Sequence, residues 1–453
     1  MFMIVAICAL CASLFAQAAP NAPVPQLPVK PAMGGPGQPQ SSNAASGVPQ
    51  AGLTLKQAEA LAIKNNPQIS VARLQALASQ QVAREYRSSF WPTAVIDVTG
   101  VDSNQSRITA GGLNNPIIYE RAATGAMVSQ LITDFGRTRN LTSSANYAAK
   151  AEDQNALATK EQVLLAVDQA FYGALQAQAI LAVARQTVSA RQDVTDQVEA
   201  LFQSKLKSEL DLSFANVNLA QAKLLLLDAD NNRSAALASL STVLGFESAQ
   251  DFVVVDDVSA PAQPPADVNN LIAQAFSMRP EILGQQFTYQ SAQKFHSAEK
   301  DLFYPDVRAL GAVGDTPVRN PILSNWYGAV GVNIEIPVFN GFLFNARSKE
   351  SSLQEQAAHD RLVDLRNRIS RDVRTSWLNA NTAYQRVSVT QQLLNQANLA
   401  LSLAQTRYNL GLSSIVELSQ AQLQQTQAEI SNAQAGYDYR LALAVLRYQT
   451  TGI

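Results

Sequence analysis

The sequence predicts a mainly α-helical chain of two tandem structural repeats, in which four strands per subunit contribute to a membrane β-barrel. Three observations predict this fold class. One plan of residues recurs in the two halves, two very long stretches are almost free of glycine and proline, and four short segments alternate apolar and polar residues. In full, we expect a trimeric twelve-stranded β-barrel that continues into a long α-helical tube.

The start of the chain predicts a secretory signal peptide over residues 1–18. An apolar run from about Ile4 to Phe15 precedes Ala16-Gln17-Ala18, which has the small-x-small pattern of a cleavage site. No lysine or arginine precedes this run, so the true start codon stays open. Residues 19–52 are rich in proline, glycine and serine, which predicts a disordered leader.

Both cysteines, Cys8 and Cys11, lie inside the predicted signal. Lipid anchoring through either of them stays open as an alternative, although bulky Ile7 and Leu10 stand where a small residue is expected. We therefore expect an exported mature chain without cysteine, and hence without a disulfide bond.

Structure is expected to begin with a pair of helices. Thr54 is placed to cap the first helix, and Pro67 ends it and starts a second helix, which runs to about Phe90.

The same plan recurs about halfway along the chain. Asn66-Pro67 recurs as Arg279-Pro280, and Phe90-Trp91-Pro92 recurs as Phe303-Tyr304-Pro305, both 213 positions later. Self-similarity at a fixed spacing indicates a duplicated structural unit. The predicted organisation is a first repeat at 53–245, a linker at 246–267 that forms part of an equatorial belt, and a second repeat at 268–453.

Each repeat contains one very long helical stretch. Residues 342–410 contain no proline or glycine, and residues 137–244 contain only Gly173. A helix from Gly136 to a break near Ser204 would be about 100 Å long. Its apolar stripe and glutamine-rich remainder suit helices that pack side by side while lining water. An ordinary coiled coil with a solvated polar face is the alternative.

The clearest strand signal is Tyr327–Val338, and Thr93–Val101, Ala123–Leu131 and Val307–Gly314 resemble it in length. Strands of about ten residues that are apolar outward and polar inward are typical of transmembrane β-barrels. Aromatic residues at the segment ends predict a girdle at the membrane interface, namely Trp91, Tyr304, Trp326 and Tyr327.

Four strands cannot close a barrel, and an open sheet edge does not occur in lipid. Two copies of the chain would give eight strands, whose interior side chains fill, whereas three copies would give twelve and leave a lumen. We therefore expect a homotrimer in a lipid bilayer.

The order of these features resembles the TolC family of outer-membrane efflux proteins, over Leu53 to Ile453. The most specific part is the break in the second long helix. The residues that match the family there are Tyr408, Asn409, Gly411, Ile415, Val416 and Glu417.

The resemblance implies an exit duct in the outer membrane of a Gram-negative bacterium, extending into the periplasm. It implies a homotrimer that docks to an inner-membrane transporter through a periplasmic adaptor protein. The turns between the long helices would form the docking surface, at Lys205, Leu206, Lys207, Ser208, Gly411, Leu412, Ser413 and Ser414.

The resemblance also implies a gate at these turns. Asp211 and Tyr408 occupy the positions of a linked acid and tyrosine, so we expect an Asp211–Tyr408 bond. Glu417 would lie near the constriction, where three carboxylates would favour cations. Two departures put the full gate network in doubt, because Ser413 replaces an arginine of the prototype and Gln420 replaces an aspartate. The first turn also lacks the family's glycine.

Other function classes find little support. A net charge of −2 does not suit nucleic acid. His296 and His359 have no metal-ligand spacing and no catalytic motif occurs, so we expect neither a cofactor nor an enzyme. Two rivals stay open, a periplasmic coiled-coil scaffold or adaptor subunit and, more weakly, an exported enzyme. The sequence specifies neither the cargo nor the class of pump.

Overall fold

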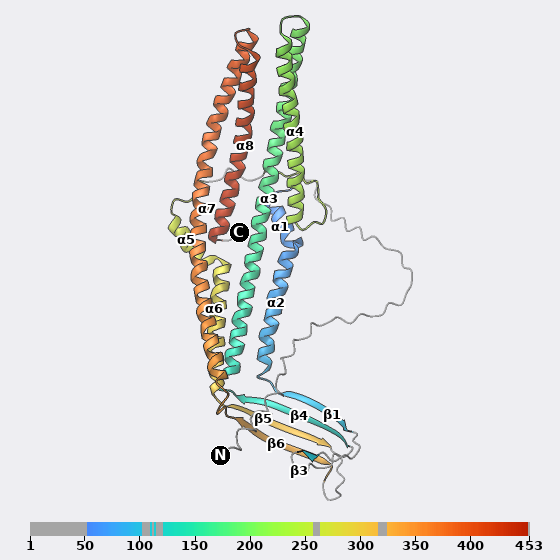
Figure 1. Cartoon of the computed structure of the whole chain (residues 1–453), viewed down its shortest axis with the longest axis vertical. Coiled ribbons are helices and arrows are strands. Elements are labelled where there is room, and N and C mark those ends of the chain that lie inside the picture. Colours follow the sequence, from blue (N-terminus) through green and yellow to red (C-terminus); the bar gives the residue numbers. More distant parts are fainter. Residues whose placement is uncertain are drawn as a thin grey trace, which may run out of the picture. The chain divides into compact units, whose positions relative to one another are not determined.

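The computed structural model describes residues 52–101, 109–110, 113–114, 121–256, 263–315 and 324–451 (Figure 1). The expected signal peptide and the expected leader up to residue 51 lie outside the described residues. None of the helices within the described ranges is long and apolar enough to cross a membrane.

The two halves of the chain have the same order of elements, as the repeat predicts. The first half contains α1 (Leu55–Asn65), α2 (Pro67–Ser88), β1 (Thr93–Val101), β4 (Arg121–Thr133), α3 (Arg137–Gln203) and α4 (Glu209–Val243). The second half contains α5 (Val268–Met278), α6 (Pro280–Lys300), β5 (Asp306–Asp315), β6 (Trp326–Glu335), α7 (Leu343–Asn409) and α8 (Ile415–Thr451). A one-turn helix, Asp301–Phe303, follows α6.

Two details differ from the sequence prediction. A short strand pair that was not predicted, β2 (Thr109–Ala110) and β3 (Leu113–Asn114), lies between β1 and β4. The last strand was predicted to reach Val338, but it ends at Glu335. Glu335 pairs with Asp306, the first residue of β5, so the neighbouring strand provides no partner beyond that point.

Local capping explains where the helices begin. The Thr54 hydroxyl accepts a hydrogen bond from the Gln57 N–H, and the Gln57 side chain accepts one from the Thr54 N–H, which forms a capping box. Asn66 caps α2, whose first residue is Pro67. Helix α3 follows Gly136, which has φ 117°. The Asp134 carboxylate accepts hydrogen bonds from the N–H groups of Gly136 and Thr138.

The helices form two rows that share α3 and α7. In the row nearer the strands, α2 packs on α3, α3 on α6, and α6 on α7 (Figure 1). In the row away from the strands, α4 packs on α3, α3 on α8, and α8 on α7. Each row therefore has an element of the first repeat at one edge and α7 of the second repeat at the other.

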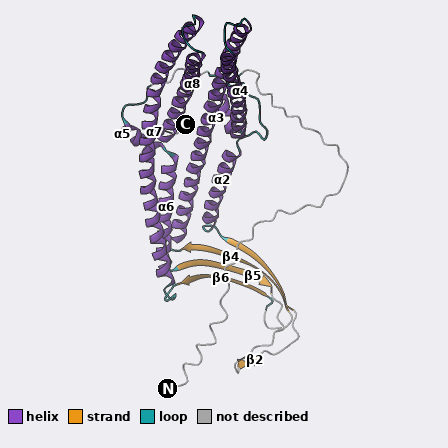
Figure 2. Cartoon of the chain, turned by 45° about the horizontal axis from the view of Figure 1, so that its top comes forward, coloured by secondary structure: helices purple, strands orange, loops and turns teal. Residues whose placement is uncertain are grey.

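The four longer strands form one antiparallel sheet in the order β1-β4-β5-β6, separate from the helices (Figure 2). Strands β1 and β6 are its edges. The sheet therefore has the same order as the helix rows, with the first repeat at one edge and the second repeat at the other.

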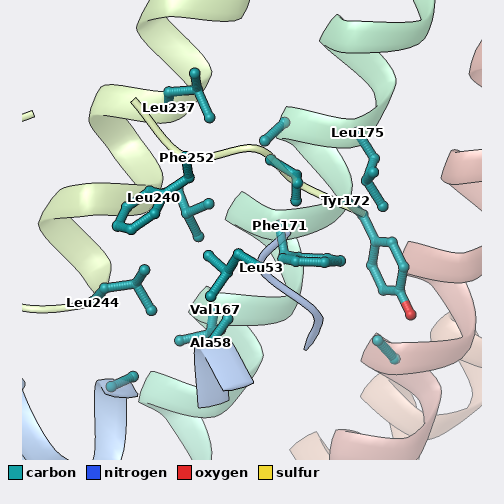
Figure 3. Packing of buried hydrophobic residues seen from close by; sticks show 14 of the residues in the cluster. Leu53, Ala58, Val167, Phe171, Tyr172, Leu175, Leu237, Leu240, Leu244 and Phe252 are labelled. Atoms are coloured by element: carbon teal, nitrogen blue, oxygen red, sulfur yellow. The ribbon is translucent and has the colours of Figure 1, made fainter. Parts of the chain in front are cut away.

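The largest core lies where α1 meets α3 and α4 (Figure 3). Phe171 of α3 and Leu240 of α4 are fully buried there. Phe252 and Val254 of the inter-repeat linker are buried in the same core, and the Leu53 N–H donates to the Val253 carbonyl over 2.7 Å. The first part of the linker is thus packed structure. Residues 257–262 of the linker lie outside the described residues.

Candidate functional site

The two turns that join the long helices share one backbone geometry. Tip 1 is Ser204–Ser208, between α3 and α4, and tip 2 is Leu410–Ser414, between α7 and α8. In tip 1 the Leu206 N–H donates to the Leu201 carbonyl over 2.9 Å, and in tip 2 the Leu412 N–H donates to the Arg407 carbonyl over 2.8 Å. The preceding residues complete the pattern, because the Lys205 N–H donates to the Phe202 carbonyl over 2.9 Å and the Gly411 N–H donates to the Tyr408 carbonyl over 3.0 Å. Each tip therefore ends its helix with a Schellman motif.

A Schellman motif requires one residue in the left-handed region. Gly411 fills this position in tip 2 with φ 72°, and Lys205 fills the equivalent position in tip 1 with φ 61°. The missing glycine noted in the sequence therefore leaves the turn intact. A lysine there has a steric cost of about 1–2 kcal/mol that glycine does not have.

The predicted Asp211–Tyr408 hydrogen bond is not formed, and that prediction is wrong for this structure. The Asp211 carboxylate instead accepts hydrogen bonds from the Ser208 N–H over 3.1 Å and from the Ser208 hydroxyl over 2.7 Å. Because Ser208 caps α4 and Asp211 is the third residue of that helix, the capping box engages the carboxylate locally.

Tyr408 nevertheless lies at the meeting point of the two tips. The side chain is only 6% exposed, and its hydroxyl has no hydrogen-bond partner among the described residues. The ammonium nitrogen of Lys207 lies 4.0 Å from the centre of the Tyr408 ring. Burial raises the pKa of the Tyr408 hydroxyl, and the nearby Asp211 carboxylate raises it further.

Apolar and polar contacts join the helices behind the tips. Val198 and Ala215 of α3 and α4 share a buried cluster with Tyr408 and with Leu418 of α8. The Asn218 amide also donates to the Ser419 hydroxyl over 2.7 Å. The first hairpin (α3 and α4) is thus packed against the second hairpin (α7 and α8) of the same chain.

Glu417, the predicted constriction residue, has a partner that the sequence analysis did not assign. Its carboxylate accepts from Arg407 Nε over 3.2 Å, across tip 2, and both side chains are about half exposed. Arg407 precedes tip 2 in the sequence and Glu417 follows it, so opposite charges on either side of a short turn were the available signal. An exposed pair of this kind contributes about 0–1 kcal/mol.

The predicted docking residues at the tips include two exposed leucines in equivalent positions. Leu206 is 71% exposed and Leu412 is 68% exposed. In contrast, the Ser413 hydroxyl oxygen is buried and has no hydrogen-bond partner among the described residues. Each tip therefore presents an exposed leucine beside exposed polar residues, which include Lys205, Ser208 and Ser414.

The sheet has two chemically different faces, because side chains alternate along each strand. The register places mostly apolar residues on one face, namely Ala94, Ile96, Val98, Ala126, Val128, Ala309, Val313, Val330, Val332 and Ile334. The other face includes Asp97, Thr99, Ser129, Asp306, Arg308, Asn333 and Glu335. Thr124, Gln130, Thr133 and Asp315 are polar residues on the apolar face, and Val95, Met127, Leu131 and Leu310 are apolar residues on the other face, which we call the polar face.

The four predicted interface aromatics lie at both ends of the sheet. Trp91 and Tyr304 precede β1 and β5, and Trp326 and Tyr327 begin β6. The structure separates the last two, because Trp326 lies on the apolar face and Tyr327 on the polar face. The Tyr327 ring lies against Gly125 and Gly314 of the neighbouring strands, where a larger residue would not fit.

The sequence analysis did not predict which charged groups are buried, namely Asp168, Arg191, Arg279 and Glu299 among the described residues. Asp168 of α3 is 3% exposed, and burial raises the pKa of its carboxyl to about 7, with Glu59 of α1 adding to the effect and Arg447 of α8 opposing it. Burial lowers the pKa of Arg191 to about 10, and its guanidinium donates to the Thr426 hydroxyl over 3.2 Å. Helical spacing alone does not reveal which polar residues become buried.

No group of three or more His, Cys, Asp or Glu side chains is placed to hold a metal ion in the part of the chain that the structure describes.

The sequence is similar to those of known outer-membrane proteins. The family model described as "Outer membrane efflux protein" matches residues 60–246 and 271–451. The outer membrane protein TolC of Escherichia coli K12 is 21% identical over 388 residues, which cover 83% of this chain and 77% of TolC.

Two solved structures share the fold. The outer membrane protein VceC of Vibrio cholerae superposes with a TM-score of 0.76 at 16% identity, covering 88% of this chain and 96% of VceC. CusC, whose crystal structures concern transmembrane channel formation, superposes with a TM-score of 0.77 at 18% identity, covering 88% of this chain and 92% of CusC.

Proposed function

Because this chain belongs to the outer membrane efflux protein family, we propose that three copies of it form an exit duct for substrates that leave the cell. The protein is located in the outer membrane of a Gram-negative bacterium and extends into the periplasm. The duct would receive its cargo from an inner-membrane transporter, through a periplasmic adaptor protein. Its role is transport, with no catalytic step.

The observation that supports the trimer proposal is that, among the described elements, the sheet and both helix rows each have two unpaired edges, in the same order along the chain. Each has a first-repeat element at one edge, namely β1, α2 or α4. Each has β6 or α7 of the second repeat at the other edge. A head-to-tail contact would pair the first-repeat edge of one copy with the second-repeat edge of the next, in the sheet and in both helix rows. Such contacts form a closed ring when the rotation from one copy to the next is a whole fraction of a full turn.

The number of copies follows from the size of the barrel. Eight strands enclose an interior that side chains fill, whereas twelve leave room for a lumen. The mostly apolar face, with Val330 and Val332 strongly exposed, would contact lipid. The polar face, with Asp97, Arg308 and Asn333, would line the lumen. Trp91, Tyr304 and Trp326 would lie at the two membrane interfaces, and Tyr327 would lie inside the barrel wall.

The tips would serve both docking and gating. Leu206 and Leu412 provide exposed apolar contacts for the adaptor protein, flanked by Lys205, Lys207, Ser208, Gly411, Ser413 and Ser414. Tyr408, Asp211 and Glu417 would lie at the constriction, where the tips of three subunits meet.

The test is to purify the processed chain in detergent, determine its mass, and record single-channel currents in planar bilayers. The expected result is a mass three times that of one chain and a small conductance that prefers cations. A monomer or dimer without conductance would refute the duct and would favour the rival proposal of a helical scaffold or adaptor subunit.

A further inference from the structure

The tips of the two hairpins touch through one cationic contact. Lys207 of tip 1 places its ammonium nitrogen 4.0 Å from the centre of the Tyr408 ring, at the end of α7. This distance is well inside the limit of about 6 Å for a cation–π interaction. The ring belongs to the buried cluster that joins the hairpins, so the lysine closes the outer end of that cluster.

Two charged side chains beside the tips, Asp211 and Glu417, are bonded to other residues and not to Lys207 or Tyr408. The Asp211 carboxylate is engaged by Ser208. Glu417 is engaged by Arg407. Lys207 forms no ion pair within 4.0 Å among the described residues, and the Tyr408 hydroxyl has no hydrogen-bond partner there. Among the described residues, Tyr408 therefore interacts with a charged group through the face of its ring and not through its hydroxyl.

The contact has no counterpart in the other half of the repeat. With the offset of 206 positions between α3 and α7, Lys207 corresponds to Ser413 and Tyr408 corresponds to Phe202. Serine provides no cation for the Phe202 ring. Tip 1 therefore supplies the charge and tip 2 supplies the ring.

We propose that Lys207 and the ring of Tyr408 form a cation–π latch that holds the two hairpins of each subunit together at their tips, and that the Tyr408 hydroxyl takes no part. The proposal rests on the proposed function in one respect: separation of the hairpins would widen the periplasmic end of the duct.

Among the polar contacts that join the hairpins in the described part of the chain, the latch lies nearest the tips. Behind it are the Asn218–Ser419 hydrogen bond of 2.7 Å and the Arg191–Thr426 hydrogen bond of 3.2 Å. Loss of the latch would therefore free the tips while the deeper contacts keep the hairpins folded and paired.

The test compares four variants of the full chain. Lys207→Met removes the charge and keeps a long stem, whereas Lys207→Arg keeps a cation. Tyr408→Phe keeps the ring and removes only the hydroxyl, whereas Tyr408→Leu removes the ring and keeps an apolar side chain. Asp211→Asn is a fifth variant that tests the alternative bond between Asp211 and the hydroxyl.

The first measurement does not depend on channel activity. Spin labels at Leu210→Cys and Leu412→Cys, in a chain with Cys8 and Cys11 replaced by Ser, report the distance between the hairpins of one subunit when labelled chains are diluted in unlabelled ones. Lys207→Met and Tyr408→Leu should shift the population toward longer distances. Lys207→Arg and Tyr408→Phe should leave the parent distribution unchanged.

The second measurement is open probability in bilayers. Lys207→Met should raise it by a factor between about 2 and about 30, the range that corresponds to the loss of one cation–π contact. The proposal would be overturned if Lys207→Met kept the distance distribution of the parent. It would also be overturned if Tyr408→Phe or Asp211→Asn raised the open probability as much as Lys207→Met does. Altered distances without conductance in any variant or the parent would support the latch and refute the duct.

Discussion

The two tips share one backbone design but place different residues in its left-handed position. Both are Schellman motifs followed by a serine before the next helix. Gly411 satisfies the left-handed position without strain, whereas Lys205 adopts it despite its side chain. The two turns therefore differ in stability more than in shape.

Lys205→Gly should stabilise the folded protein by about 1 kcal/mol, because it removes the strain of a side chain in the left-handed region. The measurement is the denaturant midpoint in detergent, followed by far-ultraviolet circular dichroism. Gly411→Ala is the matched control and should lower stability by about the same amount. Equal midpoints for parent and Lys205→Gly would contradict the strain argument.

Asp168 should make the stability of the helix bundle depend on pH. The pKa of its carboxyl is raised from 3.8 to about 7 by burial, so the folded state retains a proton that the unfolded chain releases. The free energy of unfolding is therefore highest, as far as this group is concerned, below about pH 4. It falls as pH rises to about 7, by a few kcal/mol at most.

Asp168→Asn tests this dependence, because asparagine is similar in shape and does not ionise. The variant should be more stable than the parent at pH 8, and its stability should change less between pH 4 and pH 7. Unfolding midpoints at a series of pH values provide the measurement. The same slope in parent and variant would show that the carboxyl ionises freely in the folded state.

At the scale of elements, the strands depend on where small residues are placed. Gly314 of β5 lies beneath Tyr327, and a Cβ atom there would come within 2.6 Å of the Thr124 carbonyl oxygen. Gly311 lies three residues earlier, and a Cβ atom there would meet nothing within 4 Å. The two glycines of one short strand therefore have different structural roles.

Gly314→Val should disrupt the sheet and cost about 1–3 kcal/mol, because backbone and ring would both have to move. The readout is the yield of heat-sensitive oligomer on unheated gels of outer-membrane extracts. Gly311→Val is the control and should assemble like the parent, since valine fits the mostly apolar face. Normal assembly of Gly314→Val would show that Tyr327 moves aside at little cost.

At the scale of the whole molecule, the tip charges of three subunits would act together on passing ions. Arg407 neutralises Glu417 in each subunit. Arg407→Gln should therefore strengthen the cation preference of the proposed duct, by a factor of up to about five if the pair contributes up to 1 kcal/mol. Reversal potentials in salt gradients provide the measurement. Glu417→Gln should weaken the preference, and an unchanged value in both variants would place the pair away from the ion path.

Much of the fold was accessible from local patterns in the sequence. Gly136, Pro67 and Thr54 mark helix boundaries because their backbone preferences act within a few residues, and the structure confirms these boundaries. The tandem repeat was equally visible, because it needs only the spacing of prolines and aromatic residues. The end of β6 was predicted wrongly, because strand length depends on the partner strand and not on alternation alone.

The candidate site was less accessible, because its contacts join residues about 200 positions apart. The sequence by itself determined the two repeats, the long helices, the tips and the family resemblance. Only the tertiary structure decided that Lys207 lies over Tyr408 and that Asp168 is buried. Helix caps depend on neighbours in the chain, whereas the partner of a long side chain depends on how separate helices pack, and hydrophobic spacing does not specify that packing.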